Sequence, residues 1–249
     1  MYVQPLLSQN QPLLTAPPPI QASLCTRIKA IFTKVWQWLV SCFTTTAPKP
    51  SFSKDQPTPP VIVQQPQLAM TEQSPTASEF LAFYRGTATN PQERTLNDIL
   101  TFNDTQLEET HDYIQWLFIN KAPSNFNGTA PILNTEIIQA FKEDKTLQTN
   151  LIRSFERMLK FYGLRWQENS KTIVRAKNFE DRAKVWLTIG NHNFARITRI
   201  LLCLNALGEE NRAIAFYTIL QDIATKDPKY RNIVDTSSLQ YWKAAAAPH

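Results

Sequence analysis

Asn191-His-Asn-Phe-Ala-Arg-Ile-Thr-Arg-Ile-Leu-Leu-Cys-Leu-Asn-Ala-Leu-Gly208 is the stretch that decides the fold of this 249-residue chain. Two neighbouring stripes follow helical spacing along it, an apolar one of Ile197, Leu201 and Leu204 and a polar one of His192, Arg196, Arg199 and Cys203. Asn191 suits the start of a helix and Gly208 suits its end. The stretch therefore predicts an amphipathic helix whose apolar side must be covered by other helices.

Similar helical signatures occupy the rest of residues 79–249. They predict helices over 79–85, 95–100, 105–118, 135–141, 145–162, 179–187, 192–207, 209–224 and 237–246. The expected N-terminal caps are Ser78, Thr105 with Glu108 as a capping box, Asn134 or Thr135, Asn178 and Asn191. The last helix is expected to dock through Tyr241 and Trp242. Thr172-Ile-Val is the one stretch that we expect to be extended.

Proline and glycine divide the chain unevenly. Residues 1–78 hold twelve of the seventeen Pro and none of the five Gly. We predict an all-α protein: a single compact multi-helix domain over 79–249, preceded by a disordered Pro-rich arm with one amphipathic helix. The arm divides into disordered residues 1–23, an amphipathic helix over 24–43 and a Pro-rich linker over 44–78.

The amphipathic segment 24–43 is cationic and rich in tryptophan. The uncharged run that starts within it, 35–48, is too short to span a bilayer, so the segment suits the plane of a membrane interface. The residues expected to touch lipid are Ile28, Ile31, Phe32, Val35, Trp36, Trp38 and Leu39. Docking on the helical body, docking in a partner's groove, and a lipid-modification site at Cys42 are the alternatives.

Composition excludes several classes of function. The five Gly form no GxGxxG, GxxxxGK[ST] or GxSxG motif, so the usual phosphate and nucleophile loops are missing. The three Cys and three His share no ligand spacing, and we expect neither a metal nor a cofactor. Residues 79–249 carry 21 basic and 19 acidic side chains, and this near balance argues against a nucleic-acid partner.

Four motifs occur in the body in a fixed order: Phe83-Tyr-Arg-Gly86, Glu109-Thr-His-Asp-Tyr-Ile-Gln-Trp-Leu-Phe118, Met158-Leu-Lys-Phe-Tyr-Gly163 and His192-Asn-Phe-Ala-Arg-Ile-Thr-Arg-Ile-Leu201. Over about residues 80–220 they make the chain resemble the conserved N-terminal region of the opioid growth factor receptor family. Ile119 stands where that family usually has Pro, and Val174-Arg175 where it commonly has Gly-Arg. The acidic repeats of the vertebrate receptors are absent from this sequence, so their function is not carried over.

The resemblance implies a helical domain of a receptor for a Met-enkephalin-like peptide, associated with a membrane or with the nucleus. It supplies no catalytic set and no contact residues. From the residues themselves, the candidate ligand-binding side chains are His111, Gln115, Trp116, Arg175, His192, Arg196 and Arg199. Two arginines one helical turn apart suit a bidentate grip on a carboxylate or phosphate. A histidine near a helix N-terminus would add a donor.

The same side chains also fit a structural role. Glu108 or Asp112 can pair with Arg196 or Arg199 in a partly buried network that fixes the packing of two helices. Trp116, Trp166, Trp186 and Cys203 are expected in the core. His192 and Cys203 are eleven residues apart on one helix, about 16 Å by the helical rise, so they cannot form a catalytic pair.

We therefore expect a non-enzymatic, receptor-like domain that recognises a peptide or a small anionic ligand, peripherally associated with a membrane. The main alternative is a structural or protein-interaction module that residues 24–43 hold at a membrane. An enzyme that uses His111 with Arg196 and Arg199 is the weakest alternative. A nuclear location and a secreted bacterial origin stay open.

Overall fold

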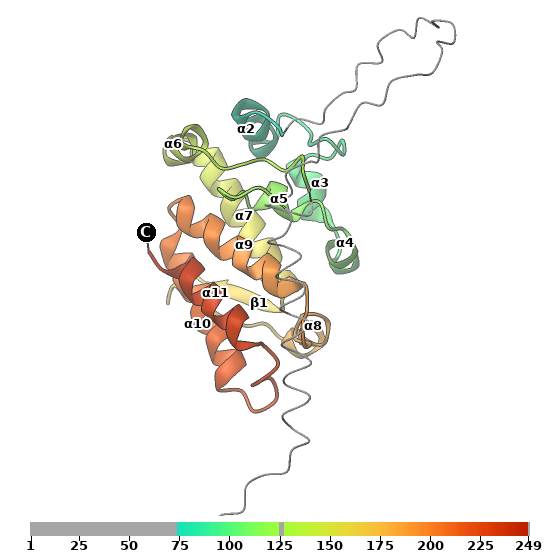
Figure 1. Ribbon diagram of the computed structural model, residues 1–249, viewed down its shortest axis with the longest axis vertical. Helices are drawn as coiled ribbons and strands as arrows, with labels where there is room; N and C mark the ends of the chain where they lie inside the picture. The colour runs from blue at the N-terminus through green and yellow to red at the C-terminus, as the bar shows by residue number, and fades with distance from the viewer. Residues whose placement is uncertain (1–73, 125–126, 249) are drawn as a thin grey trace, which may run out of the picture. The chain divides into compact units, whose positions relative to one another are not determined.

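The computed structural model describes residues 74–124 and 127–248 (Figure 1). In chain order its elements are α2 (Ala77–Arg85), α3 (Leu96–Thr101), α4 (Asp104–Glu109), α5 (Ile114–Leu117), α6 (Thr135–Glu143), α7 (Lys145–Phe161), β1 (Leu164–Gln167), β2 (Thr172–Arg175), α8 (Phe179–Trp186), α9 (Asn193–Ala206), α10 (Glu210–Thr225) and α11 (Thr236–Ala246). This part of the chain is helical apart from one small sheet, which confirms the all-α class. The predictions for 1–23, 24–43 and most of 44–78 lie outside the described residues.

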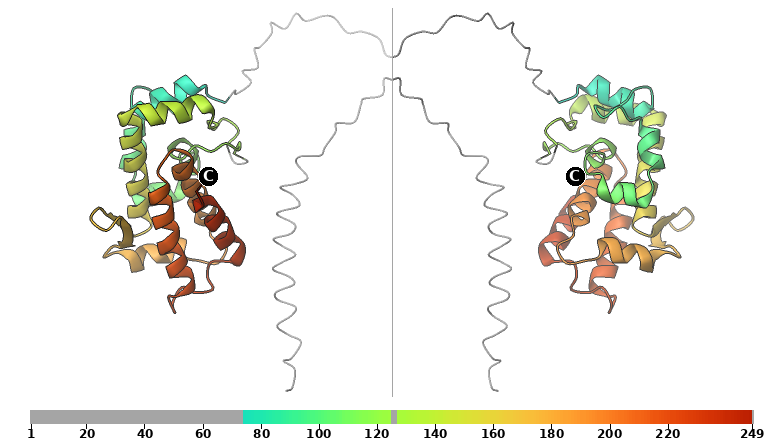
Figure 2. Two further views of the ribbon diagram at one scale, coloured as in Figure 1. Left: turned by 90° about the vertical axis from the view of Figure 1, so that its left-hand side faces the viewer. Right: turned by 90° about the vertical axis from the view of Figure 1, so that its right-hand side faces the viewer.

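The first half of the described domain is built on α7. Leu147, Leu151, Phe155 and Met158 follow one face of this helix and are buried. Helices α2, α3 and α6 pack against α7, and Figure 2 shows α2 and α6 at one end with α7 running away from them. The core of this half therefore lies between α7 and the short helices that precede it.

The second half is a group of three helices in which α9 packs against both α10 and α11. The Trp242 indole nitrogen of α11 donates to the main-chain carbonyl of Phe194 at 3.0 Å, and the two rings meet edge to face at 5.6 Å. Trp242 is fully buried, so its predicted docking is confirmed. Tyr241 is 51% exposed, so its docking prediction is wrong: it is next in sequence to Trp242 and points from another side of the helix.

Strands β1 and β2 form an antiparallel hairpin in which Trp166 lies opposite Ile173. The extended Thr172-Ile-Val stretch was predicted, but its pairing was not. The Arg212 guanidinium lies 4.5 Å above the Trp166 ring, and Arg175 pairs with Asp227 at 2.6 Å. The two contacts join the hairpin to the start of α10 and to the segment after it, and β2 packs against α10. Trp166 is only partly buried, so it belongs to the edge of the core and not to its interior.

Three of the predicted helix caps are wrong. Thr76, not Ser78, caps α2, because Thr76 has Glu79 at the third helical position to complete a capping box. Asn103 and Gln106 cap α4 in the same way, in place of Thr105 and Glu108. Asn178 makes no side-chain cap bond. The Asn191 side-chain oxygen does accept from the main-chain N–H of Asn193, at 2.9 Å, as a cap should.

The single helix predicted over 105–118 is also wrong, because the chain breaks into α4 and α5 around an extended Thr110. In a continuous helix the carbonyls of Leu107 and Glu108 would accept from the N–H groups four residues later. Here both carbonyls accept from the side chain of Arg196 instead. A tertiary contact therefore overrides the local helical periodicity.

Gly163 ends α7 with a φ of +72° and lies against the start of α8. A Cβ at this position would lie 2.7 Å from the Cα of Phe179 and 3.0 Å from the Cβ of Arg182. Gly86 has a similar φ of +82°, but a Cβ there would meet open space. Both glycines adopt a left-handed backbone conformation, which other residues rarely adopt. Only Gly163 also has no room for a side chain.

Replacing these two glycines by alanine separates the two effects. Gly86→Ala should lower the free energy of unfolding by about 1 kcal/mol, the cost of a left-handed backbone. Gly163→Ala should lower it by about 3 kcal/mol or more, because main chain must also move. Urea denaturation followed by circular dichroism measures both. Equal losses for the two variants would show that the close approach of α7 and α8 is not tight.

Candidate functional site

Arg196 of α9 lies at the centre of the predicted polar stripe and is 6% exposed. Its guanidinium donates to the main-chain carbonyls of Leu107 at 2.9 Å, Glu108 at 3.2 Å and Thr110 at 3.0 Å. These carbonyls belong to the C-terminal end of α4, where a helix has no donors of its own. Arg196 therefore caps α4 from a helix 89 residues away in sequence.

The charge of Arg196 is compensated by groups from both helices. The Glu108 carboxylate lies 3.8 Å away and the Tyr113 ring centroid 5.6 Å away. Asn193 bridges the two charged groups, accepting from Arg196 at 3.3 Å and donating to Glu108 at 3.1 Å. The predicted pairing of Glu108 with Arg196 is confirmed. Asp112 pairs with Arg94 instead, at 2.7 Å.

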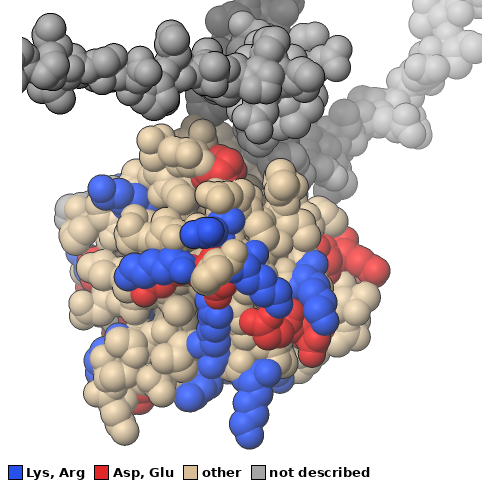
Figure 3. All heavy atoms as spheres, turned by 90° about the horizontal axis from the view of Figure 1, so that it is seen from below, with Lys and Arg blue, Asp and Glu red and all other residues tan. Residues whose placement is uncertain are grey.

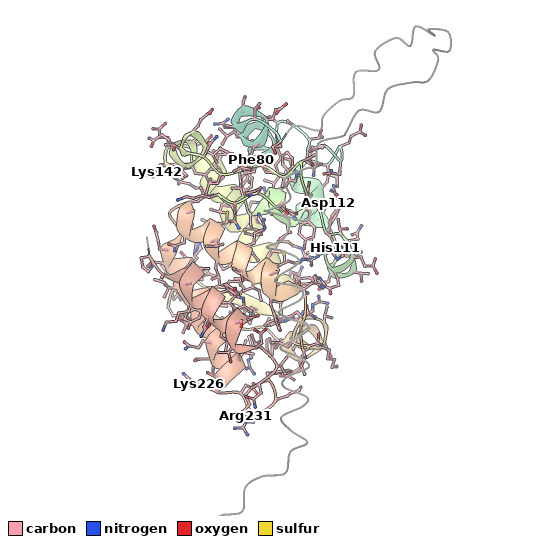
Figure 4. The ribbon with its side chains drawn as sticks, viewed as in Figure 1. Phe80, His111, Asp112, Lys142, Lys226 and Arg231 are labelled. Carbon is pink, nitrogen blue, oxygen red and sulfur yellow. The ribbon has the colours of Figure 1, made fainter. Side chains whose placement is uncertain are left out.

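His111 and His192 lie side by side at the exposed edge of this network, with ring centroids 5.4 Å apart. His111 Nδ1 is 2.7 Å from the carbonyl of Glu109, and His192 Nε2 is 3.5 Å from a Glu108 oxygen. Burial and the positive charge of Arg196 lower the pKa of His192, and Glu108 offsets this only in part. Figure 4 shows His111 and Asp112 together beside α4.

The remaining predicted site residues lie in different surroundings. Gln115 is buried; the amide orientation that satisfies both of its polar atoms has the nitrogen donating to the main-chain carbonyls of His111 and Asp112 at 3.2 Å each. Trp116 is buried and meets the Phe83 ring edge to face at 4.9 Å. Trp116 is thus a core residue, as the structural alternative predicted.

Arg199 and Arg175 are also engaged in contacts of their own. Arg199 donates to the main-chain carbonyl of Phe118 at 3.1 Å. Arg175 lies at the end of β2, over the Phe179 ring at 4.4 Å and paired with Asp227. The structure therefore brings His111, His192 and Arg196 together, but it turns the arginine donors of the stripe toward main-chain carbonyls. Ligand binding by these residues stays a prediction.

A groove between the hairpin and α10 was not predicted from the sequence. Its volume is about 870 Å³, and its apolar lining consists of Trp166, Ile173, Val174, Ile214, Ala215 and Ile219. Ile214 is 42% exposed, which is unusual for a large apolar side chain in this domain. One sequence feature could have indicated this groove: Ile214, Ala215 and Ile219 lie beside the core positions of a single helix. They make its apolar face wider than burial in the core requires.

Charged side chains lie at both ends of this groove. Arg212 and Glu209 line one end with Lys171, and Asp222 lines the other. Glu209 and Arg212 approach to 3.2 Å, and partial burial raises the pKa of the Glu209 carboxyl. The middle of the groove is therefore apolar and its ends are polar, an arrangement typical of sites that orient a ligand.

No group of three or more His, Cys, Asp or Glu side chains that could hold a metal ion occurs among residues 74–124 and 127–248. Burial raises the pKa of the Cys203 thiol to about 12, so this core cysteine stays protonated and unreactive at neutral pH. Within the same ranges, no helix is long and apolar enough to cross a bilayer.

Comparison with known proteins shows which family the chain matches. The family model of the opioid growth factor receptor (OGFr) conserved region matches residues 73–247. The chain belongs to the opioid growth factor receptor family. The predicted resemblance over about 80–220 is confirmed, and the family match extends past it at both ends.

Several curated relatives carry the family name. The opioid growth factor receptors of Mus musculus and Homo sapiens are each 39% identical over 136 residues, or 53% of this chain. The opioid growth factor receptor-like protein 1 of Mus musculus is 36% identical over 106 residues, or 43% of this chain. The chain spans only about a fifth of the length of these relatives. No solved structure matches it.

Arg196→Ala tests the structural role of the buried guanidinium. The variant removes the Arg196 donor from the carbonyls of Glu108 and Thr110, leaves the Leu107 carbonyl with only the Tyr113 hydroxyl, and takes the buried cation away from Glu108. The free energy of unfolding should therefore fall by about 2–4 kcal/mol. Thermal melting measures the loss. Arg85→Ala is the matched control, because Arg85 is 41% exposed and pairs only with a surface carboxylate, so its melting temperature should hardly change. An unchanged melting temperature for Arg196→Ala would contradict the structural role of these contacts.

Proposed function

We propose that this domain is a non-enzymatic, receptor-like binding module and that the groove between the hairpin and α10 takes a short peptide. The observation that carries the proposal is the groove itself, with its apolar middle and charged ends. The arginines of the polar stripe, by comparison, already donate to main-chain carbonyls. The stripe arginines are therefore occupied by the protein itself, and the groove is the better candidate for a ligand site.

The size of the groove suits a peptide of a few residues. Its lining extends along α10 from Asn211 to Asp222, about 16 Å by the helical rise. An extended chain advances about 3.3 Å per residue, so about five residues match this length. The volume of about 870 Å³ also lies in the range of small-ligand sites, which is roughly 300–1,000 Å³.

The family relationship supplies the probe. The curated relatives are named as receptors for an opioid growth factor, and the sequence motifs resemble receptors for a Met-enkephalin-like peptide. Met-enkephalin is a short peptide with free termini and aromatic side chains. Its apolar side chains would contact Ile214 and Trp166, and its termini would reach the charged ends of the groove.

Binding, and not catalysis, is the activity that we propose. The one thiol among the described residues, that of Cys203, is buried with a raised pKa. The two described histidines face Glu108 and main-chain oxygen and touch no hydroxyl or thiol nucleophile. The groove is lined by side chains suited to contact and orientation.

Ile214→Asp tests the groove. A carboxylate in the apolar middle should weaken binding of labelled Met-enkephalin to the full chain at least about tenfold. Ile132→Asp is the matched control, because Ile132 is 38% exposed and lies outside the groove, so its affinity should equal that of the wild type. Fluorescence anisotropy measures both affinities.

Two results would contradict the groove as the binding site. One is equal affinity of the wild type and Ile214→Asp. The other is a loss of binding in His192→Ala while Ile214→Asp binds normally, which would place the ligand at the polar stripe. His192 is a suitable residue for this comparison because its side chain is 45% exposed and can be removed without opening the core.

We also propose that residues 24–43 bring the domain to a membrane surface as an interfacial amphipathic helix. The support is the sequence pattern of Ile28, Ile31, Val35 and Leu39 with interspersed Lys and Arg. In liposome flotation the full chain should float with vesicles, and a chain that begins at Ser74 should float less. Starting at Ser74 keeps Thr76, which caps α2. Equal amounts of both chains in the soluble fraction would overturn the proposal.

A further inference from the structure

Two segments that are far apart in sequence form one end of the domain, the lower end in Figure 1. Residues 175–186 contain α8, and residues 226–231 follow α10. The rings of Phe179 and Tyr230 meet edge to face at 5.8 Å, and the Tyr230 hydroxyl donates to Glu180 at 2.8 Å. Arg175 pairs with Asp227 across the same junction. We call residues 175–186 and 226–231 the basic face.

The basic face carries more positive charge than the domain as a whole. It contains seven Lys and Arg and three Asp and Glu, a net charge of +4, whereas residues 79–249 together carry only +2. Asp222, which pairs with Lys226 at 2.7 Å, lowers the local value to +3. The rest of the domain therefore has no positive excess. Figure 3 shows this end from below, with Lys and Arg side chains over it and Asp and Glu side chains among them.

The seven basic side chains of the basic face divide into three groups. Arg182 and Lys184 are engaged within or beside α8, because Arg182 donates to the main-chain carbonyl of Phe161 and Lys184 pairs with Asp181 at 2.8 Å. Arg175 and Lys229 hold the junction, through ion pairs with Asp227 and Glu180. Lys177, Lys226 and Arg231 are exposed, and neither Lys177 nor Arg231 has an ion-pair partner among the described residues. The exposed group can thus be neutralised without breaking the packing of α8 on the segment after α10.

We propose that the basic face binds an anionic lipid surface. Exposed basic side chains on long flexible stems act as point charges, which suit a diffuse layer of anionic headgroups better than a shaped partner. A membrane surface attracts several such charges at once, and each contributes most at low salt. Stable anchoring of a peripheral protein takes two signals, such as one apolar element and one basic patch. The inference therefore rests on the proposed membrane role of residues 24–43 and supplies its second signal.

The test compares two variants of the full chain that lose the same charge. Lys177→Gln, Lys226→Gln and Arg231→Gln together neutralise the basic face. Lys121→Gln, Lys142→Gln and Lys145→Gln together neutralise exposed lysines elsewhere on the domain. Figure 4 shows Lys142 at the end of the domain away from Lys226 and Arg231.

Flotation uses vesicles of phosphatidylcholine alone and of three parts phosphatidylcholine to one part phosphatidylserine. The basic-face variant should partition onto the anionic vesicles about tenfold less than the wild type at low salt. The control variant should match the wild type, and all three chains should bind neutral vesicles equally. High salt should remove the difference between the variants.

The outcomes separate this inference from the proposal for residues 24–43. If the wild type binds neutral vesicles and both variants lose the same amount on anionic ones, the basic face is not the lipid site, although the role of 24–43 stands. If the wild type binds neither kind of vesicle, both proposals fail. A wild type that binds a DNA duplex at the same salt but not anionic vesicles would overturn the lipid assignment.

Discussion

The buried guanidinium of Arg196 is the interaction on which the arrangement of this domain depends. It donates to three carbonyls of the segment that ends α4, and among residues 74–124 and 127–248 its ion-pair partner is the carboxylate of Glu108. A buried charge is tolerated only when its donors are satisfied, so α4 and α9 must lie where they do. The same contact breaks the helix between α4 and α5, and this break turns Trp116 into the core beside α2.

Most of the fold could be predicted from local signals. Helical periodicity and glycine stops gave the extents of α7, α9 and α10 to within a residue or two, because those helices follow their intrinsic pattern. The wrong caps of α2 and α4 are errors of choice between neighbouring polar residues, because complete capping boxes stand two residues earlier at Thr76 and Asn103. The larger errors lie where residues distant in sequence determine the structure. The break at Thr110 depends on Arg196, and the pairing of the hairpin depends on α10, which lies beside β2. No local pattern contains that information.

The candidate site was harder to predict than the fold. The polar stripe of α9 is visible in the sequence, and its pairing with Glu108 follows from complementary charge. Whether such a stripe faces a ligand or the main chain of a neighbouring helix depends on where that second helix lies. The periodicity of one helix contains no information on the position of another. The groove needs a hairpin and a helix side by side, and only its apolar surplus at Ile214 and Ile219 appears in the sequence. The family relationship identifies the domain without locating its ligand.

The capping of α4 by Arg196 also has a consequence for the order of events during synthesis. Leu107 emerges from the ribosome 89 residues before the side chain that takes its carbonyl. Until then, the segment from 105 to 118 has only its local preference for a continuous helix. The end of α4 therefore cannot take its finished form until α9 has been synthesised, so a contact between two early elements of the chain is completed by a late one.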